Sequence, residues 1–523
     1  MNIARILRMH AETRSDATAM IDTHSGRRRT FTFAELELAS ARAATMLAQA
    51  GLQPGDAVLI FQPMSAELYI ALSAIFRLGL VAMFIDPGQG KAHLEQSCTL
   101  HRPQALIGNA KAHLLRLISP QLRSIPRKFV IGTRLPGAIP WRHAANLQPY
   151  HEIHHCAPDN PALLTFTSGS TGRPKAALRT HGFLLAQHEA LVDSLRLRAG
   201  VVDLTTMPIV ALANLASGVT SLIPGADLRR PATVKPAPIV AQIQAERVSS
   251  TVASPALLER LARYCLANHI TLTGLRRVST GGAPVFPRLL HQLQQIAPGA
   301  DVEAVYGSTE AEPMAKITYG QILDGDRQRM REGGGLLTGR PVDSLQLRIM
   351  KNQWGTPAGP FTEIEFASRC CATEQAGEIV VSGAHVLSGY WHGHGDQETK
   401  FRVNGTIWHR TGDTGHLDAR GRLWLLGRCT ARIDDDFGTL HPFAAECAAS
   451  YDLDIRRVAA ASEADRRILA VDLYDPKAKP DLASLKESLA WAHLDEIRVF
   501  KHLPVDQRHN AKIDYPALRK MLA

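Results

Sequence analysis

The chain contains no long uninterrupted apolar run. Its first 20 residues are interrupted by charged side chains such as Arg8 and Glu12, so they lack the apolar core and the cleavage site of a secretory signal. The stretch nearest to a membrane span, residues 68–84, contains Arg77 and is better explained as a helix followed by a strand. These absences argue against secretion and against a membrane span, and we expect a cytoplasmic protein.

Cysteine is scarce, and it lacks the spacing of a metal or redox site. The seven cysteines form no CxxC pair, and an odd number scattered over 523 residues is typical of reduced thiols. The GxGxxG fingerprint is also missing after any early strand, which disfavours a dehydrogenase.

The formal net charge is +10. Such an excess can indicate nucleic acid, a membrane surface or an anionic ligand, but the basic residues are spread along the chain. We interpret them as side chains on a solvated surface and expect no nucleic-acid partner.

The order of helical and strand-like segments predicts an α/β protein. A chain with 45% hydrophobic residues can bury a full core and divide into two or more units. In the first 150 residues, amphipathic segments alternate with short apolar ones, as in residues 65–79 followed by 80–88, which is typical of parallel α/β layers. From Thr362 to Gly427 the pattern changes to short strands with glycine turns. The predicted domains are residues 1–428, with several subdomains, and residues 429–523, a small mobile α+β domain.

The strongest local signal is residues 164–178, LTFTSGSTGRPKAAL. An apolar strand runs into a turn in which glycines let backbone N–H groups approach phosphate oxygens, while hydroxyls add donors and a lysine adds charge. Ala176 follows this lysine where a Walker A loop needs Ser or Thr, so an ordinary P-loop enzyme is disfavoured. A flexible surface linker is the alternative, and the return to apolar residues argues against it. The predicted phosphate-binding residues are Thr167, Ser168, Gly169, Ser170, Thr171, Gly172 and Lys175.

Further motifs follow in a characteristic order. They are Gly281-Gly282-Ala283-Pro284, Tyr306-Gly307-Ser308-Thr309-Glu310, Gly339-Arg340-Pro341, Thr411-Gly412-Asp413, Gly427-Arg428 and Lys512. Together with the glycine-rich turn, they resemble the adenylate-forming superfamily of acyl-CoA synthetases, peptide-synthetase adenylation domains and luciferases over nearly the whole chain. Each motif alone is a weak signal, whereas their joint order is specific.

The resemblance implies that ATP activates a carboxylic acid as an acyl-AMP, and it implies a role for each residue. The implied nucleotide-binding residues are Gly282, Ala283 and Pro284 beside adenine, Tyr306 stacked on it, Gly307 and Ser308 in the same motif, Asp413 on the ribose, and Arg428. Thr309 would approach the α-phosphate, and Glu310 would hold Mg²⁺, which prefers carboxylate and phosphate oxygens. Taken singly, Tyr306 could equally be a core residue and Asp413 a turn former.

Lys512 is the implied catalytic residue of the C-terminal tail, together with Thr309 and Glu310. Adenylation brings a carboxylate to an anionic α-phosphate, and an ammonium group offsets that repulsion and stabilises the transition state. Without the resemblance, Lys512 would be interpreted as a surface lysine on a basic tail.

Two segments depart from the family's pattern. Thr430 stands where acyl-CoA ligases have the hinge aspartate, and the following loop has three consecutive acids, residues 434–436, which argues against a requirement for CoA. Ala211 stands where many of these ligases have a gating histidine. Ala211, Leu212 and Ala213 form an apolar run that suits either an acyl pocket or ordinary core packing.

Four further segments matter here: SGVTSLIPGADLRRPA (217–232), SPALLERLARY (254–264), VYGSTEAEPMA (305–315) and RHNAKID (508–514). Together with the missing histidine they resemble the β-lactone synthetases of bacterial olefin biosynthesis. This resemblance implies a long-chain 2-alkyl-3-hydroxy acid whose hydroxyl displaces AMP to close a four-membered ring. It also implies a multienzyme assembly with thiolase-like or hydrolase-like proteins. The alternatives are an acyl-CoA or acyl-carrier-protein ligase and, from another class, a non-catalytic nucleotide- or acyl-AMP-binding relative.

Residues 151–155 match the HExxH pattern of zinc proteases literally. That pattern needs a helix, but Pro149 and Pro158 leave too little room for a stable one. We expect these histidines to lie in a loop.

Overall fold

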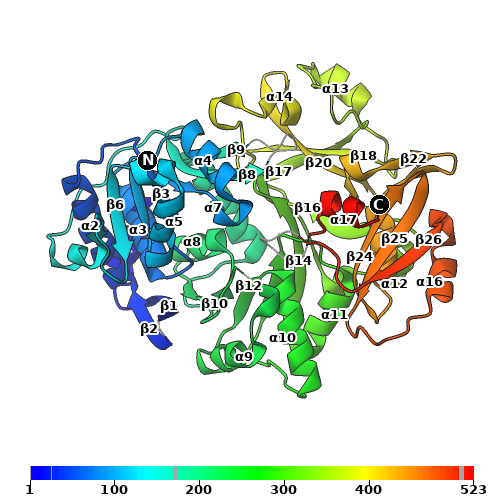
Figure 1. Cartoon of the computed structure of the whole chain (residues 1–523), viewed down its shortest axis with the longest axis horizontal. Helices are drawn as coiled ribbons and strands as arrows, with labels where there is room; N and C mark the ends of the chain where they lie inside the picture. Colours follow the sequence, from blue (N-terminus) through cyan, green and yellow to red (C-terminus); the bar gives the residue numbers. More distant parts are fainter. Residues whose placement is uncertain (1, 25, 169–173, 230, 506–511, 523) are drawn as a thin grey trace. The chain divides into compact units, whose positions relative to one another are not determined.

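The computed structural model describes residues 2–24, 26–168, 174–229, 231–505 and 512–522 (Figure 1). They form two compact units. The first unit comprises residues 1–228, 245–252 and 387–396, and the second comprises residues 229–244, 253–386 and 397–523. No helix in the part of the chain just given is long and apolar enough to cross a membrane.

The first unit contains a seven-stranded sheet in the order β7-β6-β5-β3-β4-β8-β9. Neighbouring strands run parallel except β8 and β9, which are antiparallel. The strands are β3 (Ala57–Phe61), β4 (Val81–Phe84), β5 (Ala105–Asn109), β6 (Arg127–Ile131), β7 (Ile139–Pro140), β8 (Pro161–Ser168) and β9 (Pro174–Thr180).

Helices cover both faces of this sheet. Along β3, Val58 and Ile60 join one apolar core, whereas Leu59 and Phe61 join the other, as the two-residue period of a strand requires. The first core includes α2 (Phe33–Gln49) and α3 (Ala66–Arg77), and the second includes α4 (Lys91–Leu100), α5 (Ala110–Ile118) and α6 (Pro120–Ser124). The predicted helix followed by a strand is therefore confirmed as α3 and β4.

Local sequence explains where these helices begin. Thr32 and Glu35 form a capping box at the start of α2, and Asn109 accepts a hydrogen bond from the Ala112 N–H at the start of α5. A proline occupies the first turn of α8 (Pro208–Ala216), where its missing N–H costs no helical hydrogen bond. The first unit also contains α1 (Ala4–Thr13), α7 (His181–Leu195), and the strands β1 (Thr18–His24), β2 (Arg27–Thr32), β10 (Val202–Thr205) and β11 (Thr220–Leu222).

In the second unit, β13 (Arg277–Gly281) pairs in parallel with β14 (Asp301–Ser308), and an antiparallel series follows. Its strands are, in spatial order, β15 (Ala311–Thr318), β16 (Leu336–Pro341), β21 (Leu423–Arg428), β20 (Thr406–Leu417), β18 (Gly377–Gly383) and β17 (Leu345–Met350). The helices α10 (Pro255–Ala267), α11 (Pro287–Ile296) and α12 (Asp324–Arg331) belong to the same unit.

The C-terminal segment has its own three-stranded sheet, seen in orange and red in Figure 1. It consists of β24 (Ile455–Glu463), β25 (Arg466–Leu473) and β26 (Glu496–Phe500), with α15 (Pro442–Ala449), α16 (Leu482–Ser488) and α17 (Tyr515–Leu522). The α/β fold class is confirmed, with large sheets up to residue 428 and two small sheets among the described residues after it. The domain boundary at Arg428 and the mobility of residues 429–523 stay predictions.

Candidate active site

Three side chains of the second unit form a connected polar group. Tyr306 Oη donates a hydrogen bond to Asp413 Oδ2 at 2.7 Å, and Arg428 Nη1 lies 3.1 Å from Asp413 Oδ1. The Asp413 side chain remains 15% exposed. Each carboxylate oxygen has a second lone pair, so Asp413 can still accept hydrogen bonds from a ligand.

Strand register brings these residues together. Asp413 on β20 is paired directly with Arg428 on β21. Tyr306 lies near the end of β14, and Thr309 and Glu310 form the turn into β15, where the Glu310 N–H donates to Ser308 Oγ at 3.2 Å. The hydroxyl, carboxylate and guanidinium groups therefore come from strand ends or adjacent turns.

Neighbouring groups at this site shift the pKa values of Tyr306 and Arg428. Burial, followed by the neighbouring Asp413 carboxylate, raises the pKa of Tyr306 well above its usual value, so the phenol stays a neutral donor. Asp413 in turn raises the pKa of Arg428, with smaller contributions from Tyr306 and Glu310. The Arg428 side chain is 56% exposed, which leaves its remaining N–H groups accessible to an anion.

The predicted adenine wall begins beside Tyr306. Gly281 on β13 is paired with Val305 on β14, so residues 282–284 leave the sheet next to the tyrosine. A Cβ atom at Gly281 would lie 2.5 Å from the Val305 carbonyl oxygen, and Gly282 has a φ of +81°. Both positions need glycine, the first for close packing and the second for its backbone conformation.

Hydrogen bonds of Thr411 and a buried ion pair next to it hold the strand of Asp413 in place. The sequence alone does not reveal these contacts. Thr411 Oγ1 donates to the Ile379 carbonyl at 2.8 Å and accepts from the Asp413 N–H at 3.1 Å. Next to it, Arg410 and Glu378 form an ion pair of 2.7 Å in which both side chains are fully buried. The sequence shows a charged residue in each of two apolar strands, but not that they are partners.

In the first unit, Lys175 lies on β9 opposite Thr167 on β8. Its side chain is buried, and its ammonium nitrogen lies 5.9 Å from the centroid of the Tyr390 ring. A cation over an aromatic face is favourable. Four predicted phosphate-binding residues, Gly169, Ser170, Thr171 and Gly172, lie outside the described residues.

Lys512 is exposed and lies just before α17. Described residues near it are anchored: Val505 and Ile513 form a β-bridge, and Tyr515 donates a hydrogen bond to the buried Glu446. Glu446 also accepts from the Ala460 N–H at 3.0 Å. Glu446 and Tyr515 are 69 residues apart in the chain, so no local pattern in the sequence reveals this anchor.

Two of the three acids after Thr430 make structural ion pairs. Asp434 binds Arg432 at 2.8 Å, and Asp435 binds both Nε and Nη2 of Arg467 at 2.7 and 2.6 Å. The Arg467 side chain is only 3% exposed. These carboxylates therefore shape the hairpin of β22 (Ile433–Asp435) and β23 (Gly438–Leu440).

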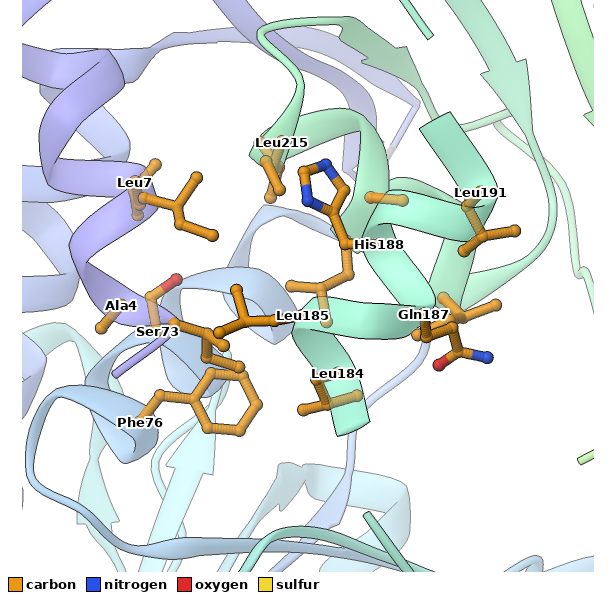
Figure 2. Close-up of a pocket in the computed structure, with 16 residues that line it drawn as sticks. Ala4, Leu7, Ser73, Phe76, Leu184, Leu185, Gln187, His188, Leu191 and Leu215 are labelled. Carbon is orange, nitrogen blue, oxygen red and sulfur yellow. The ribbon is translucent and has the colours of Figure 1, made fainter. Parts of the chain in front are cut away.

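An apolar pocket lies among α1, α3, α7 and α8 in the first unit (Figure 2). Its cavity volume is about 50 Å³, and it is partly open to solvent. Leu212 and Ala213, two of the predicted acyl-pocket residues, are among its lining residues, whereas Ala211 is fully buried in the adjacent core. Figure 2 shows Leu7, Phe76 and Leu184 around the same space.

The HExxH segment has no secondary structure, as predicted for a loop. The His154 N–H donates to the Arg77 carbonyl, which ties the segment to α3. Among the residues outside the undescribed gaps, no group of three or more His, Cys, Asp or Glu side chains is placed to hold a metal ion.

Comparisons with known proteins identify the family of the chain. The family model described as AMP-binding enzyme matches residues 7–391. An olefin β-lactone synthetase of Stenotrophomonas maltophilia is 30% identical over 92% of this chain and 90% of its own length, and one of Xanthomonas campestris is 31% identical over 92% and 89%.

Solved structures share the fold over the full length. The amide bond synthetase of Marinactinospora thermotolerans has a TM-score of 0.81 at 21% identity, covering 100% of this chain and 99% of that one. The ATP-bound MatB protein of Rhodopseudomonas palustris has a TM-score of 0.80 at 21% identity, with the same coverage. The chain therefore belongs to the AMP-binding enzyme family of ATP-dependent, adenylate-forming ligases.

Proposed function

We propose that this chain is a β-lactone synthetase that acts on a long-chain 2-alkyl-3-hydroxy acid. The observation that supports it best is the similarity to two olefin β-lactone synthetases over about nine-tenths of each chain. An indoleacetate–CoA ligase of Aromatoleum aromaticum is 30% identical over 59% of this chain, and a 4-coumarate–CoA ligase of Narcissus pseudonarcissus is 24% identical over 79%.

The first half-reaction is adenylation. A carboxylate oxygen attacks the α-phosphorus of ATP, the bond to the β-phosphate breaks, and pyrophosphate leaves. We assign the ribose to Asp413, the adenine to Tyr306 and residues 282–284, and phosphate oxygens to Lys175 and Thr309. Lys512 would stabilise the negative charge that develops in the transition state.

Mg²⁺ fits the residues that are present. This ion is usually held by one or two carboxylates together with substrate phosphates, and it keeps several waters. Glu310 supplies one carboxylate at a turn beside Ser308 and Thr309. We propose that Glu310 holds Mg²⁺, which would offset the charge of the polyphosphate.

In the second half-reaction the substrate's own hydroxyl replaces an external nucleophile. Its oxygen bonds to the acyl carbon, the bond from that carbon to AMP breaks, and the hydroxyl proton is released with AMP as the leaving group. Because both reacting groups belong to one molecule, the enzyme needs only to hold a reactive conformer. We assign the alkyl chain to the side of the apolar pocket that Leu212 and Ala213 line.

This proposal makes CoA unnecessary. The replacement of the hinge aspartate by Thr430 supports it, whereas Asp434 and Asp435 are accounted for by their internal ion pairs. A cytoplasmic location and an assembly with thiolase-like or hydrolase-like proteins belong to the same proposal, and a pull-down that recovers no such protein would count against the assembly.

The test is incubation of the purified protein with ATP, Mg²⁺ and a racemic 2-alkyl-3-hydroxy acid, with and without CoA, followed by NMR and mass spectrometry. We expect a β-lactone and AMP without CoA. The matched control is the same acid without its 3-hydroxyl group, which should give acyl-AMP but no lactone. Accumulation of acyl-AMP that only CoA or a carrier protein discharges would instead identify a thioester ligase.

A further inference from the structure

The positive charge of the chain is concentrated in one segment. Residues 96–151 contain eight lysines and arginines and no aspartate or glutamate. The whole chain has 49 acidic residues among 523, so about five would be expected in a segment of this length. This segment therefore accounts for +8 of the net charge of +10. The expectation that the basic residues are spread evenly along the chain is wrong for this segment.

The same segment contains an exposed apolar helix face. On α5, Leu114, Leu117 and Ile118 are 59%, 71% and 56% exposed. Their spacing of three and four residues places them on one side of the helix. The opposite side buries Ala112 and His113 against the sheet.

Cations surround this face. Lys111 is exposed on α5 itself, and Arg123 donates to the carbonyl oxygens of Arg116 and Leu117 at 3.2 and 3.0 Å, at the end of the helix. Arg116 lies close enough to Lys128 to help burial lower the pKa of that lysine. No carboxylate from residues 96–151 offsets this group of cations.

The turn after β6 brings a further cation to the helix. A Cβ atom at Gly137 would lie 3.4 Å from Arg116 Nη2, so this turn passes beside α5. Arg134 is exposed in the same turn. The surface formed by Leu114, Leu117 and Ile118 with the cations Lys111, Arg116, Arg123, Lys128 and Arg134 is called the α5 surface below.

We propose that the α5 surface binds anionic lipid membranes peripherally. Aliphatic side chains on an amphipathic helix insert at the boundary between headgroups and acyl chains, and lysines and arginines attract anionic headgroups. Charge complementarity points to the membrane, because exposed aliphatic side chains bordered by cations of a single sign match acyl chains beneath anionic headgroups. Supply of the long-chain acid from the bilayer is a further step that rests on the proposed function. Docking to the membrane does not depend on that function.

The test is co-sedimentation of the full-length protein with vesicles, using phosphatidylcholine alone and phosphatidylcholine mixed with phosphatidylglycerol. We expect binding to the mixed vesicles only, and weaker binding at high salt, which screens the cations. The triple variant Leu114→Ser/Leu117→Ser/Ile118→Ser and the charge variant Lys111→Glu/Arg134→Glu should each bind at least about tenfold more weakly.

Ile364→Ser is the matched control, since Ile364 is 84% exposed but lies between Glu363 and Glu365 on α13 (Glu363–Arg369). Its vesicle binding should equal that of the unmodified protein. Adenylation of a short soluble acid should be unchanged in every variant, which separates loss of docking from loss of fold or of the proposed function.

Three results would overturn the proposal. They are no sedimentation of the unmodified protein with phosphatidylglycerol, equal binding by the triple variant, and equal binding to neutral vesicles. Loss of self-association in the triple variant without vesicle binding would assign the α5 surface to a second copy of the chain.

Discussion

Tyr306 and Asp413 are 107 residues apart in the chain and are joined by a hydrogen bond of 2.7 Å. The phenol holds the carboxylate from one side while Arg428 holds it from the other. The carboxylate is therefore oriented before any ligand arrives, which reduces the entropy lost on binding.

Asp413→Ala should weaken ATP binding by about 10- to 100-fold, because hydrogen bonds to a charged group contribute about 1.5–3 kcal/mol. Tyr306→Phe should have a smaller effect, since Asp413 keeps its contact with Arg428. Isothermal titration calorimetry with ATP measures both. Unchanged affinity in Asp413→Ala would refute the ribose assignment.

Lys512→Ala should abolish acyl-AMP formation and leave ATP binding largely intact, because the ammonium acts mainly on charge that develops in the transition state. Pyrophosphate release in the presence of the acid is the measurement. Lys520→Ala is the matched control, since Lys520 is an exposed lysine on α17. Normal pyrophosphate release by Lys512→Ala would remove this residue from the mechanism.

Glu446 should make stability depend on pH. Burial raises the pKa of this carboxyl from 4.5 to about 7, although the Tyr515 hydroxyl opposes the shift. Below about pH 4.5 the group is protonated in both the folded and the unfolded state. Between about pH 4.5 and 7 the unfolded state loses its proton first, so the free energy of unfolding falls, by about 3 kcal/mol in total.

The measurement for Glu446 is urea unfolding at pH 5 and pH 8. Glu446→Gln cannot titrate, so its loss of stability between these values should be smaller than that of the unmodified protein. An equal loss in both proteins would show that Glu446 is not the group responsible.

Glu378→Ala should destabilise the second unit by about 3–5 kcal/mol, because it leaves Arg410 charged and unpaired in a fully buried position. The matched control is Glu374→Ala, which breaks a pair whose side chains are 37% and 44% exposed and should cost less than about 1 kcal/mol. Thermal unfolding of both variants tests the contrast, and equal costs would contradict it.

The sequence predicts the helices and strands of this protein better than the side-chain contacts between them. The helix and strand at residues 66–84 follow from hydrophobic periodicity, which is a local signal. The motifs around Tyr306 and Asp413 were found because each is contiguous in the chain. The Glu378–Arg410 and Glu446–Tyr515 pairs were not, because a charge inside an apolar strand or helix shows that a partner is needed but not which one.

Ala211, Leu212 and Ala213 illustrate a second limit. Their composition predicts an apolar environment, and all three have one. Only the helical conformation of α8 separates Leu212 and Ala213, which line the pocket, from Ala211, which packs into the core.

The direct pairing of Asp413 with Arg428 limits how the chain can change during evolution. The two residues face each other across a hairpin whose turn, residues 418–422, is fastened by hydrogen bonds to Asp418. A substitution in this turn changes one side chain. The hairpin already contains one β-bulge, between Thr414 and Gly415, and a further single-residue insertion in either strand would shift the register of the residues beyond it. Functional relatives are therefore expected to vary in the composition of this hairpin while keeping fourteen residues between the aspartate and the arginine.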